Sequence, residues 1–242
     1  MSVYFEINGG LLKNIVKAIE NLNEECIFSF DSKGFYIQLS DVYKYKMLEL
    51  FISSEDLESY ECDEMADLGF IIDRVKDVSK TLKVRDSLIF SYKGGANIVL
   101  KANGISRSIK LIDTDIIGRV PSLALAEKDL SNGYSANIDS SSLNTFLKAA
   151  SNAISFDVKT EDGNLNISSS TDEGLIEVGW EDIQLTPSNY GSNTNYSIAE
   201  VSKAVSIMDG LTRIRGCQDG LIEFKWKMGN ESYARAMIAA RV

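Results

Sequence analysis

Lysine recurs at helical spacing on the polar face of several amphipathic segments. Lys13 and Lys17 are four residues apart, and a later segment repeats this spacing with Lys76, Lys80 and Lys83. Residues separated by four lie on one face of an α-helix, so each segment forms a row of ammonium groups. Such rows bind the phosphates of a polyanion without reading its sequence. Two further segments add one lysine each, and the predicted polyanion-facing set, called here the lysine rows, is Lys13, Lys17, Lys76, Lys80, Lys83, Lys148 and Lys203.

The lysine rows contrast with the charge of the whole chain. The 242 residues contain 25 Lys and Arg against 35 Asp and Glu, which gives a net charge of −10. The predicted helices, taken with Lys83 and the capping Asp139, have the opposite balance, with eight basic residues against five acidic ones. Such a chain is expected to attract a polyanion with one surface and to repel it with the rest. A solvated helix face also favours lysine, so this pattern alone leaves a plain surface role open.

The residue types that usually carry catalysis are largely missing. Histidine is absent, which excludes Ser-His and Cys-His nucleophile systems and His-zinc sites. No phosphate-binding glycine motif and no Cys-rich zinc spacing occur, so we expect neither a cofactor nor a metal. Carboxylates remain at Glu24–Glu25, Asp113/Asp115 and Glu161–Asp162, all at predicted element ends, where acids usually solvate a turn. A carboxylate-based hydrolase is therefore a weak alternative, since it needs two acids facing each other at about 5–10 Å.

Two halves of the chain repeat one order of predicted elements, and these elements must position the lysines. In each half the hydrophobic periodicity predicts a strand, a helix, three strands, a second helix and three more strands. The predicted helices cover 10–22, 73–82, 140–150 and 197–208, the third capped by Asp139 or Ser140. The predicted strands cover 3–7, 25–30, 35–39, 45–52, 86–91, 96–101 and 105–112, then 134–138, 153–159, 164–169, 174–180, 212–217, 220–228 and 231–239.

Residues 114–131 join the two halves. Gly118 and Pro121 interrupt this segment, which indicates an extended linker. The predicted division is an N-terminal domain over 1–116, a linker over 117–131 and a C-terminal domain over 132–242. No apolar run reaches the roughly 20 residues that span a bilayer, so no membrane contact is expected. Three widely spaced cysteines are expected to be reduced, as in an intracellular protein.

Several short motifs, in order, resemble one family over essentially the whole chain. They lie at 11–19 (Leu-Leu-Lys…Ala-Ile), 35–41 (Phe-Tyr-Ile-Gln-Leu-Ser-Asp), 57–63 (Leu-Glu-Ser-Tyr-Glu-Cys-Asp), 78–83 (Val-Ser-Lys-Thr-Leu-Lys) and 110–113 (Lys-Leu-Ile-Asp), with a closing Ala-Met-Ile-Ala-Ala-Arg at 236–241. This set resembles the proliferating cell nuclear antigen family, the DNA sliding clamps of archaea, eukaryotes and some of their viruses. The resemblance is strongest in the first half.

The resemblance implies an α+β DNA-clamp fold. Each chain would hold two similar domains, each with two helices packed on antiparallel β-sheets, and three chains would close into a ring lined by twelve helices. Twelve helices at about 8–10 Å spacing form a circle roughly 30–40 Å across, which admits a DNA duplex. Neighbouring subunits would pair edge strands. The implied interface residues are Ser106, Arg107, Ser108, Ile109 and Leu111 on one strand, and Leu175, Ile176, Val178 and Trp180 on the other.

The family's partners insert a short peptide into an apolar pocket under the interdomain linker. The matching positions are Ser40, Lys44, Tyr45, Val120, Pro121, Leu221, Met237, Ala239 and Ala240. Val120–Pro121 fits the family pattern, whereas Ser40 replaces an apolar residue and Ala240 replaces a proline. These departures suit a divergent viral clamp or one specialised subunit of a heterotrimer.

The function that the resemblance implies is non-enzymatic. The ring would encircle duplex DNA, act as a polymerase processivity factor and dock replication and repair proteins. A separate ATP-driven clamp loader would open it, and it would assemble with itself as a homotrimer or with sister subunits. A checkpoint-type or transcription-linked clamp of the same fold is the alternative. The expected location is cytoplasmic for an archaeal or viral source and nuclear for a eukaryotic one.

Overall fold

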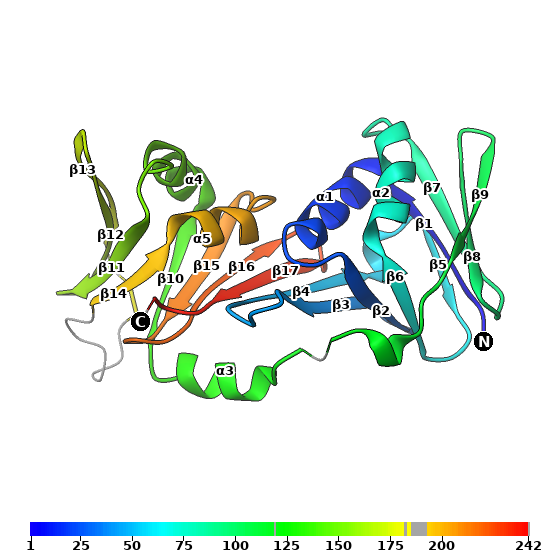
Figure 1. The fold of residues 1–242 in the computed structure, drawn as a ribbon, viewed down its shortest axis with the longest axis horizontal. Coiled ribbons are helices and arrows are strands. Elements are labelled where there is room, and N and C mark those ends of the chain that lie inside the picture. Colours follow the sequence, from blue (N-terminus) through cyan, green and yellow to red (C-terminus); the bar gives the residue numbers. More distant parts are fainter. Residues whose placement is uncertain (119, 182, 185–192, 242) are drawn as a thin grey trace. The chain divides into compact units, whose positions relative to one another are not determined.

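The computed structural model describes residues 1–118, 120–181, 183–184 and 193–241 (Figure 1). The chain forms two compact units. The first unit comprises 1–42, 48–120 and 228–234, and the second comprises 43–47, 121–227 and 235–242. The chain passes from one unit to the other between Val120 and Pro121, inside the segment predicted as a linker. Within the described ranges, none of the helices has the length and apolar character needed to cross a membrane.

The first unit consists of two helices and two sheets. Its elements are β1 (Val3–Asn8), α1 (Gly9–Glu20), β2 (Glu25–Asp31), β3 (Gly34–Ser40), most of β4 (Lys46–Ser53), the 3-10 turn η1 (Ser54–Asp56), β5 (Ser59–Cys62), β6 (Ala66–Ile71), α2 (Ile72–Thr81), β7 (Ser87–Tyr92), β8 (Asn97–Ala102), β9 (Ile105–Lys110) and the 3-10 turn η2 (Thr114–Ile116). One sheet has the order β5-β1-β7-β8-β9, and in the other the strands run β4-β3-β2-β6.

An aromatic cluster fills the core of the first unit. Alternation in β1, β2, β3 and β7 places the phenylalanines of these strands inward. The rings of Phe5 and Phe90 stack with centroids 4.5 Å apart, and those of Phe28 and Phe70 lie 4.6 Å apart. Helix α1 covers this cluster with the apolar stripe predicted from its sequence, which includes the buried Ile15. This packing turns the opposite, lysine-bearing face of α1 outward.

The second unit has the same plan with an added helix. Its elements are α3 (Leu123–Leu130), β10 (Tyr134–Asp139), α4 (Ser140–Ala149), β11 (Ser155–Glu161), β12 (Asn164–Thr171), β13 (Gly174–Trp180), β14 (Asn193–Ser197), α5 (Ile198–Ala204), β15 (Leu211–Gly216), β16 (Ile222–Lys227) and most of β17 (Tyr233–Ile238). One sheet has the order β13-β12-β11-β14, and in the other the strands run β10-β15-β16-β17.

Helix α4 is fixed by a cap at its start and by packing along its inner face. The Asp139 carboxylate accepts a hydrogen bond from the Ser141 amide at 2.9 Å, which confirms the predicted cap. On the inner face, the ring of Phe146 packs edge-on against Phe156 with centroids 5.9 Å apart. Leu143 of α4 is fully buried, and the residues that α5 turns inward are buried as well, so both helices direct their apolar sides into the unit.

All four predicted helices are present, and the predicted α+β architecture of helices packed on antiparallel sheets is confirmed. The interpretation of 114–131 as an extended linker is wrong, because Leu123–Leu130 forms α3. Ala126 and Leu130 are four apart and both buried, so tertiary packing stabilises this helix. The predicted element order also omits β5, β6 and β14. Helix α5 ends at Ala204 rather than Met208, since the Val-Ser-Ile run at 205–207 consists of weak helix formers.

Candidate nucleic-acid interface and partner surfaces

Five of the predicted lysines lie on the helix pair of the first unit. Helices α1 and α2 pack against each other (Figure 1). The Lys76 ammonium group bridges them by lying 2.6 Å from a carboxylate oxygen of Glu20 on α1, and this hydrogen bond raises the pKa of Lys76. Lys13 donates to the carbonyl oxygen of Leu82. Their positive charge is thus partly balanced, and both side chains are only partly exposed.

The remaining lysines of this pair are more accessible. Lys80 lies 3.5 Å from the Asp77 carboxylate in an exposed i,i+3 ion pair. Lys17 is exposed in the last turn of α1, and Lys83 is exposed just beyond the end of α2. Exposed pairs are weak and screened by salt, so the Lys80 ammonium group can exchange its partner for an incoming phosphate at little cost.

The second unit offers one lysine on each of its two helices that pack together, α4 and α5. Lys148 is exposed in the last turn of α4, with the exposed hydroxyl groups of Ser141 and Thr145 on the same helix face. Lys203 on α5 lies 3.9 Å from Glu200. Hydroxyl groups also bind phosphates, so this face is polar but less cationic than that of the first unit.

Both strands predicted to join subunits are sheet edges. Strand β9 is the outer strand beside β8, and β13 is the outer strand beside β12. Ile109 is only 3% exposed and packs into its own unit, whereas Leu175 is 64% exposed. An edge strand presents unpaired backbone groups, so each can accept another strand. Of the other predicted interface residues, Ser106, Arg107 and Ser108 are exposed, and Leu111, Ile176, Val178 and Trp180 are partly exposed.

The two edges differ in charge. Strand β9 carries Arg107 and Lys110, and its neighbour β8 adds Lys101 at the register position opposite Ser106. Strand β13 carries Glu177, and the turn before it carries two more acids at 172–173. One edge is therefore basic and the other acidic.

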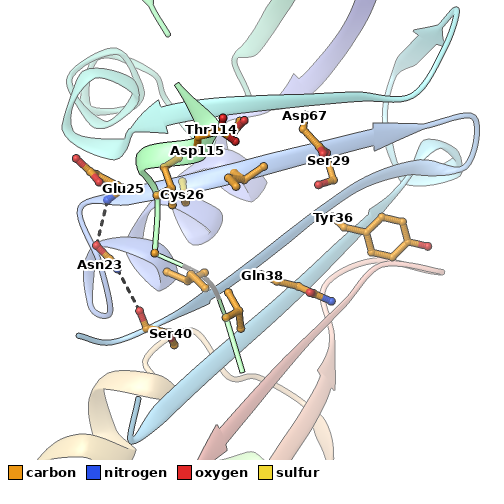
Figure 2. A pocket seen from close by; sticks show the side chains of 15 residues that line it. Asn23, Glu25, Cys26, Ser29, Tyr36, Gln38, Ser40, Asp67, Thr114 and Asp115 are labelled. Carbon is orange, nitrogen blue, oxygen red and sulfur yellow. Dashed lines mark hydrogen bonds between the residues drawn. The ribbon is translucent and has the colours of Figure 1, made fainter. Parts of the chain in front are cut away.

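A cavity of about 630 Å³ lies in the first unit between the 114–120 segment and the outer face of β2 and β3 (Figure 2). Ser40 and Val120, from the predicted peptide pocket, both line it. The Asn23 amide donates to the Ser40 carbonyl oxygen at 3.1 Å and fixes the end of β3. The lining carries three carboxylates and, among the described residues, no cationic side chain; the acids are Glu25, Asp67 and Asp115.

Other predicted pocket residues lie in the second unit. The Ala239 amide donates to the Tyr45 carbonyl oxygen at 2.8 Å, and the Ala240 amide donates to Gly220 at 3.1 Å, next to Leu221. Met237 is 1% exposed, so its side chain is buried in the second unit rather than presented to a peptide. At the surface, Lys44 and Tyr45 are exposed and Pro121 is partly exposed.

Sequence reasoning missed most of the polar residues of the cavity. Tyr36, Gln38 and Ser40 alternate along β3 and place their side chains on its outer face, where all three line the cavity. The alternation is visible in the sequence, but only the sheet shows which face lies under the 114–120 segment. A residue outside the cavity also orients Gln38, because the Gln38 amide donates a hydrogen bond of 3.1 Å to the Glu49 carboxylate.

Comparison with known proteins finds similarity to one family. Residues 4–116 match the family described as proliferating cell nuclear antigen, N-terminal domain. A DNA polymerase sliding clamp of Archaeoglobus fulgidus is 28% identical over 125 residues, covering 50% of this chain and 51% of that relative. The chain thus spans about half the length of this curated relative.

Two solved structures extend the likeness to the whole fold. PCNA of A. fulgidus, bound to the C-terminal region of FEN-1, has a TM-score of 0.88 at 18% identity and covers 99% of this chain and 98% of its own. The PCNA2–PCNA3 complex of Sulfolobus tokodaii gives 0.83 at 18% identity over 100% and 99%. In sequence over residues 4–116 and in fold over both halves, this chain is similar to proliferating cell nuclear antigens.

Proposed function

We propose that this protein is a DNA sliding clamp, a ring that encircles duplex DNA and serves as a polymerase processivity factor and docking platform. The observation that carries the proposal is a pair of similar units in which each helix pair buries its apolar side and turns lysine outward. The relative from A. fulgidus is itself named a DNA polymerase sliding clamp. The ring supplies binding and topology, and no catalytic step is assigned to it.

The lysine rows suit weak binding to DNA. Lys76, Lys80 and Lys203 lie near carboxylates of their own helix pair, so each keeps part of its charge balanced. Contacts of this kind are non-specific and salt-sensitive. A closed ring does not depend on strong affinity, because DNA cannot leave without opening it. Moderate phosphate contacts then hold the ring on the duplex while permitting it to slide.

Self-assembly follows from the two edge strands. Strand β9 of one copy can pair with β13 of the next, which satisfies both edges and opposes a basic strand to an acidic one. Pairing β9 with β9, or β13 with β13, would oppose like charges, which is destabilising. The edges therefore favour head-to-tail assembly, and the resemblance to sliding clamps implies a ring of three, formed by identical copies or with sister subunits. Partner proteins would dock by a short peptide at the predicted pocket, and a separate clamp loader would supply ATP-driven opening in the cytoplasm or nucleus of the source.

The decisive experiment uses DNA topology. The protein is loaded with a clamp loader onto nicked circular DNA, purified by gel filtration and then treated with a restriction enzyme that linearises the circle. A sliding ring stays on the circle and runs off the linear DNA, whereas blocking both ends with bound protein retains it. Equal retention on circular and open-ended linear DNA would contradict the proposal.

The lysine rows make a separate prediction. Replacing Lys13, Lys80 and Lys148 together with alanine is expected to weaken DNA retention and polymerase stimulation while the oligomeric mass stays unchanged. The slope of log affinity against log salt should fall in magnitude by about 0.9 for each phosphate that the variant no longer neutralises.

The matched control for this triple variant replaces Lys33, Lys93 and Lys159, three exposed lysines of the strands and turns. It removes the same charge from the chain but leaves the helix faces intact. An equal weakening of DNA retention in both triple variants would show that only net charge matters, and the assignment of the lysine rows to the DNA-facing surface would then be wrong.

A further inference from the structure

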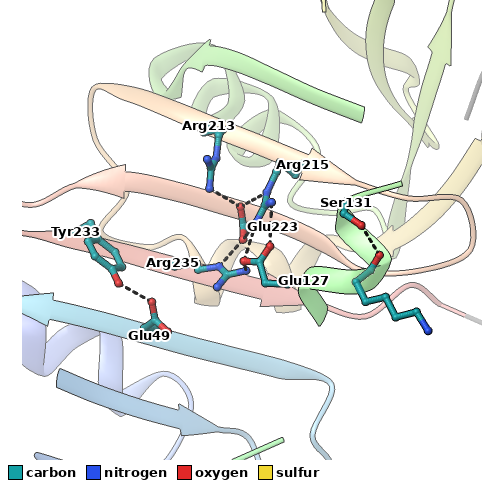
Figure 3. Close-up of polar contacts among 9 residues, drawn as sticks. Glu49, Glu127, Ser131, Arg213, Arg215, Glu223, Tyr233 and Arg235 are labelled. Atoms are coloured by element: carbon teal, nitrogen blue, oxygen red, sulfur yellow. Dashed lines mark hydrogen bonds and ion pairs between the residues drawn. The ribbon is translucent and has the colours of Figure 1, made fainter. Parts of the chain in front are cut away.

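A buried cluster of charges lies on one face of the sheet in the second unit (Figure 3). Glu223 on β16 is fully buried and accepts two hydrogen bonds of 2.7 Å from Arg215 on β15. Arg235 on β17 also donates to it, and Arg213 donates at 3.3 Å. One carboxylate thus faces three guanidinium groups, and the cluster retains positive charge for a second acid.

Helix α3 supplies that second acid. Glu127 accepts a two-pronged pair of hydrogen bonds from Arg215, at 3.0 and 3.1 Å, and another from Arg235. The bond from Arg215 lowers the pKa of Glu127, which keeps the carboxylate charged at neutral pH. Bidentate arginine–carboxylate pairs are among the stronger polar contacts in proteins. Glu127 therefore ties α3 to β15 and β17.

Helix α3 has few other features that stabilise it. It has eight residues, well below the roughly 12–15 at which isolated helices become marginally stable in water. Its N-cap residue Ser122 makes no side-chain capping hydrogen bond. Among the side chains that the structure describes on this helix, the buried ones are the small Ala126 and Leu130. The ion pairs of Glu127 therefore add to the packing of Ala126 and Leu130 in holding the helix.

The state of α3 sets the length of the free linker. With α3 folded, six residues (117–122) separate η2 from α3, and they reach about 20 Å when extended. With α3 released, residues 117–133 separate η2 from β10 and reach about 55 Å. Ile117, Gly118 and Val120 line the cavity of the first unit. Release of α3 would therefore loosen residues that form this cavity.

We propose that Glu127 is a latch: its pairing with Arg215 and Arg235 keeps α3 folded, keeps the linker short, and so preorganises the linker residues that line the cavity. The latch rests on the contacts in the second unit. Only its effect on peptide affinity rests also on the proposed docking function. Preorganised segments bind with less loss of conformational entropy, so the latch is expected to strengthen peptide binding.

The test compares two variants that each remove one negative charge from α3. Glu127→Gln breaks the latch, whereas Asp129→Asn alters an exposed carboxylate on the same helix. Hydrogen exchange of α3 and of the 117–120 segment is measured in the intact protein, together with the affinity for a C-terminal FEN-1 peptide. We expect about fivefold faster exchange and several-fold weaker peptide binding in Glu127→Gln, and no change in Asp129→Asn.

The two readouts separate the latch from the proposed function. Unchanged exchange in Glu127→Gln, with the fold intact by circular dichroism, overturns the latch. Faster exchange with unchanged peptide affinity supports the latch and counts against the predicted peptide pocket. Equal effects of both substitutions also overturn it, because the charge of the helix rather than the ion pair would then be responsible.

Discussion

Replacing Lys110 with glutamate is expected to dissociate the proposed ring, and adding Glu177→Lys to the same chain is expected to restore it. On each edge strand, the residues opposite a buried residue of the neighbouring strand face the core, and the residues between them face outward. Arg107 and Ile109 lie opposite the buried Leu100 and Ile98, so Lys110 points to the outer side of its sheet. On β13, Val178 lies opposite the buried Ile167, so Glu177 is also on the outer side.

Joining the two sheets with their faces matched puts Lys110 and Glu177 on the same side of the joined sheet, and we expect the register that brings these opposite charges opposite or diagonal to each other. An opposite-charge cross-strand pair stabilises by roughly 0.5 kcal/mol and a like-charge pair destabilises by a similar amount, so the substitution changes each contact by about 1 kcal/mol. A closed ring of three contains this pair three times, so Lys110→Glu costs about 3 kcal/mol per ring. That is roughly a hundredfold in the assembly constant, since about 1.4 kcal/mol corresponds to a factor of ten.

Light scattering across a concentration series measures this effect. The unmodified chain should approach three times 26.7 kDa, Lys110→Glu should shift toward the monomer, and the doubly exchanged chain should return to the trimer. Lys93→Glu, in an exposed turn of the same unit, is the matched control. A wild-type chain that stays monomeric at every concentration would contradict homotypic assembly and point to sister subunits. Failure of the double exchange would place the contact elsewhere.

The sequence predicted elements well where one face of a segment is buried by many residues. Helix α1 shows this, because Ile15, Ile19 and their neighbours form a continuous stripe that the structure buries. Helix α3 escaped prediction because Gly118 and Pro121 indicated a loop, and its own apolar signal is short. Its stability comes from contacts with β15 and β17, which are distant in sequence and have no local signature.

The sequence predicted where charged side chains lie on the helices, but it did not predict which groups they pair with. The spacing of Lys76 and Lys80 indicated a shared helix face, yet only the packing of α1 on α2 shows that Lys76 pairs with Glu20. The cluster around Glu223 has the same origin. Arg215 and Glu223 are direct cross-strand neighbours, a relation set by the register of β15 and β16 rather than by local sequence.

Replacing Glu223 with glutamine is expected to produce the largest loss of stability of any single change considered. The carboxylate is 0% exposed and faces Arg213, Arg215 and Arg235. Removing one member of a buried charge cluster leaves the others uncompensated and costs about 3–5 kcal/mol. Glu127→Gln should cost only about 1 kcal/mol, because Glu127 is half exposed and Glu223 still pairs with the arginines.

Lowering the pH should cause part of the same loss of stability in the unmodified protein. Burial alone would raise the pKa of Glu223, but the hydrogen bonds and charge of Arg215 and Arg235 outweigh burial and leave the pKa below its usual value. A lowered pKa in the folded state means that the carboxylate stabilises the fold above about pH 4.5, its value when unfolded, and that this contribution disappears as the pH falls further.

Urea unfolding at pH 7 and at several lower pH values tests both statements, with Glu161→Gln at an exposed strand end as the control. The free energy of unfolding of Glu223→Gln should lie well below that of the unmodified protein at pH 7, and the difference should narrow as the pH falls below about 4.5. A variant as stable as Glu161→Gln at pH 7 would show that the three arginines do not depend on Glu223. The cluster would then be too well hydrated to fix the position of α3.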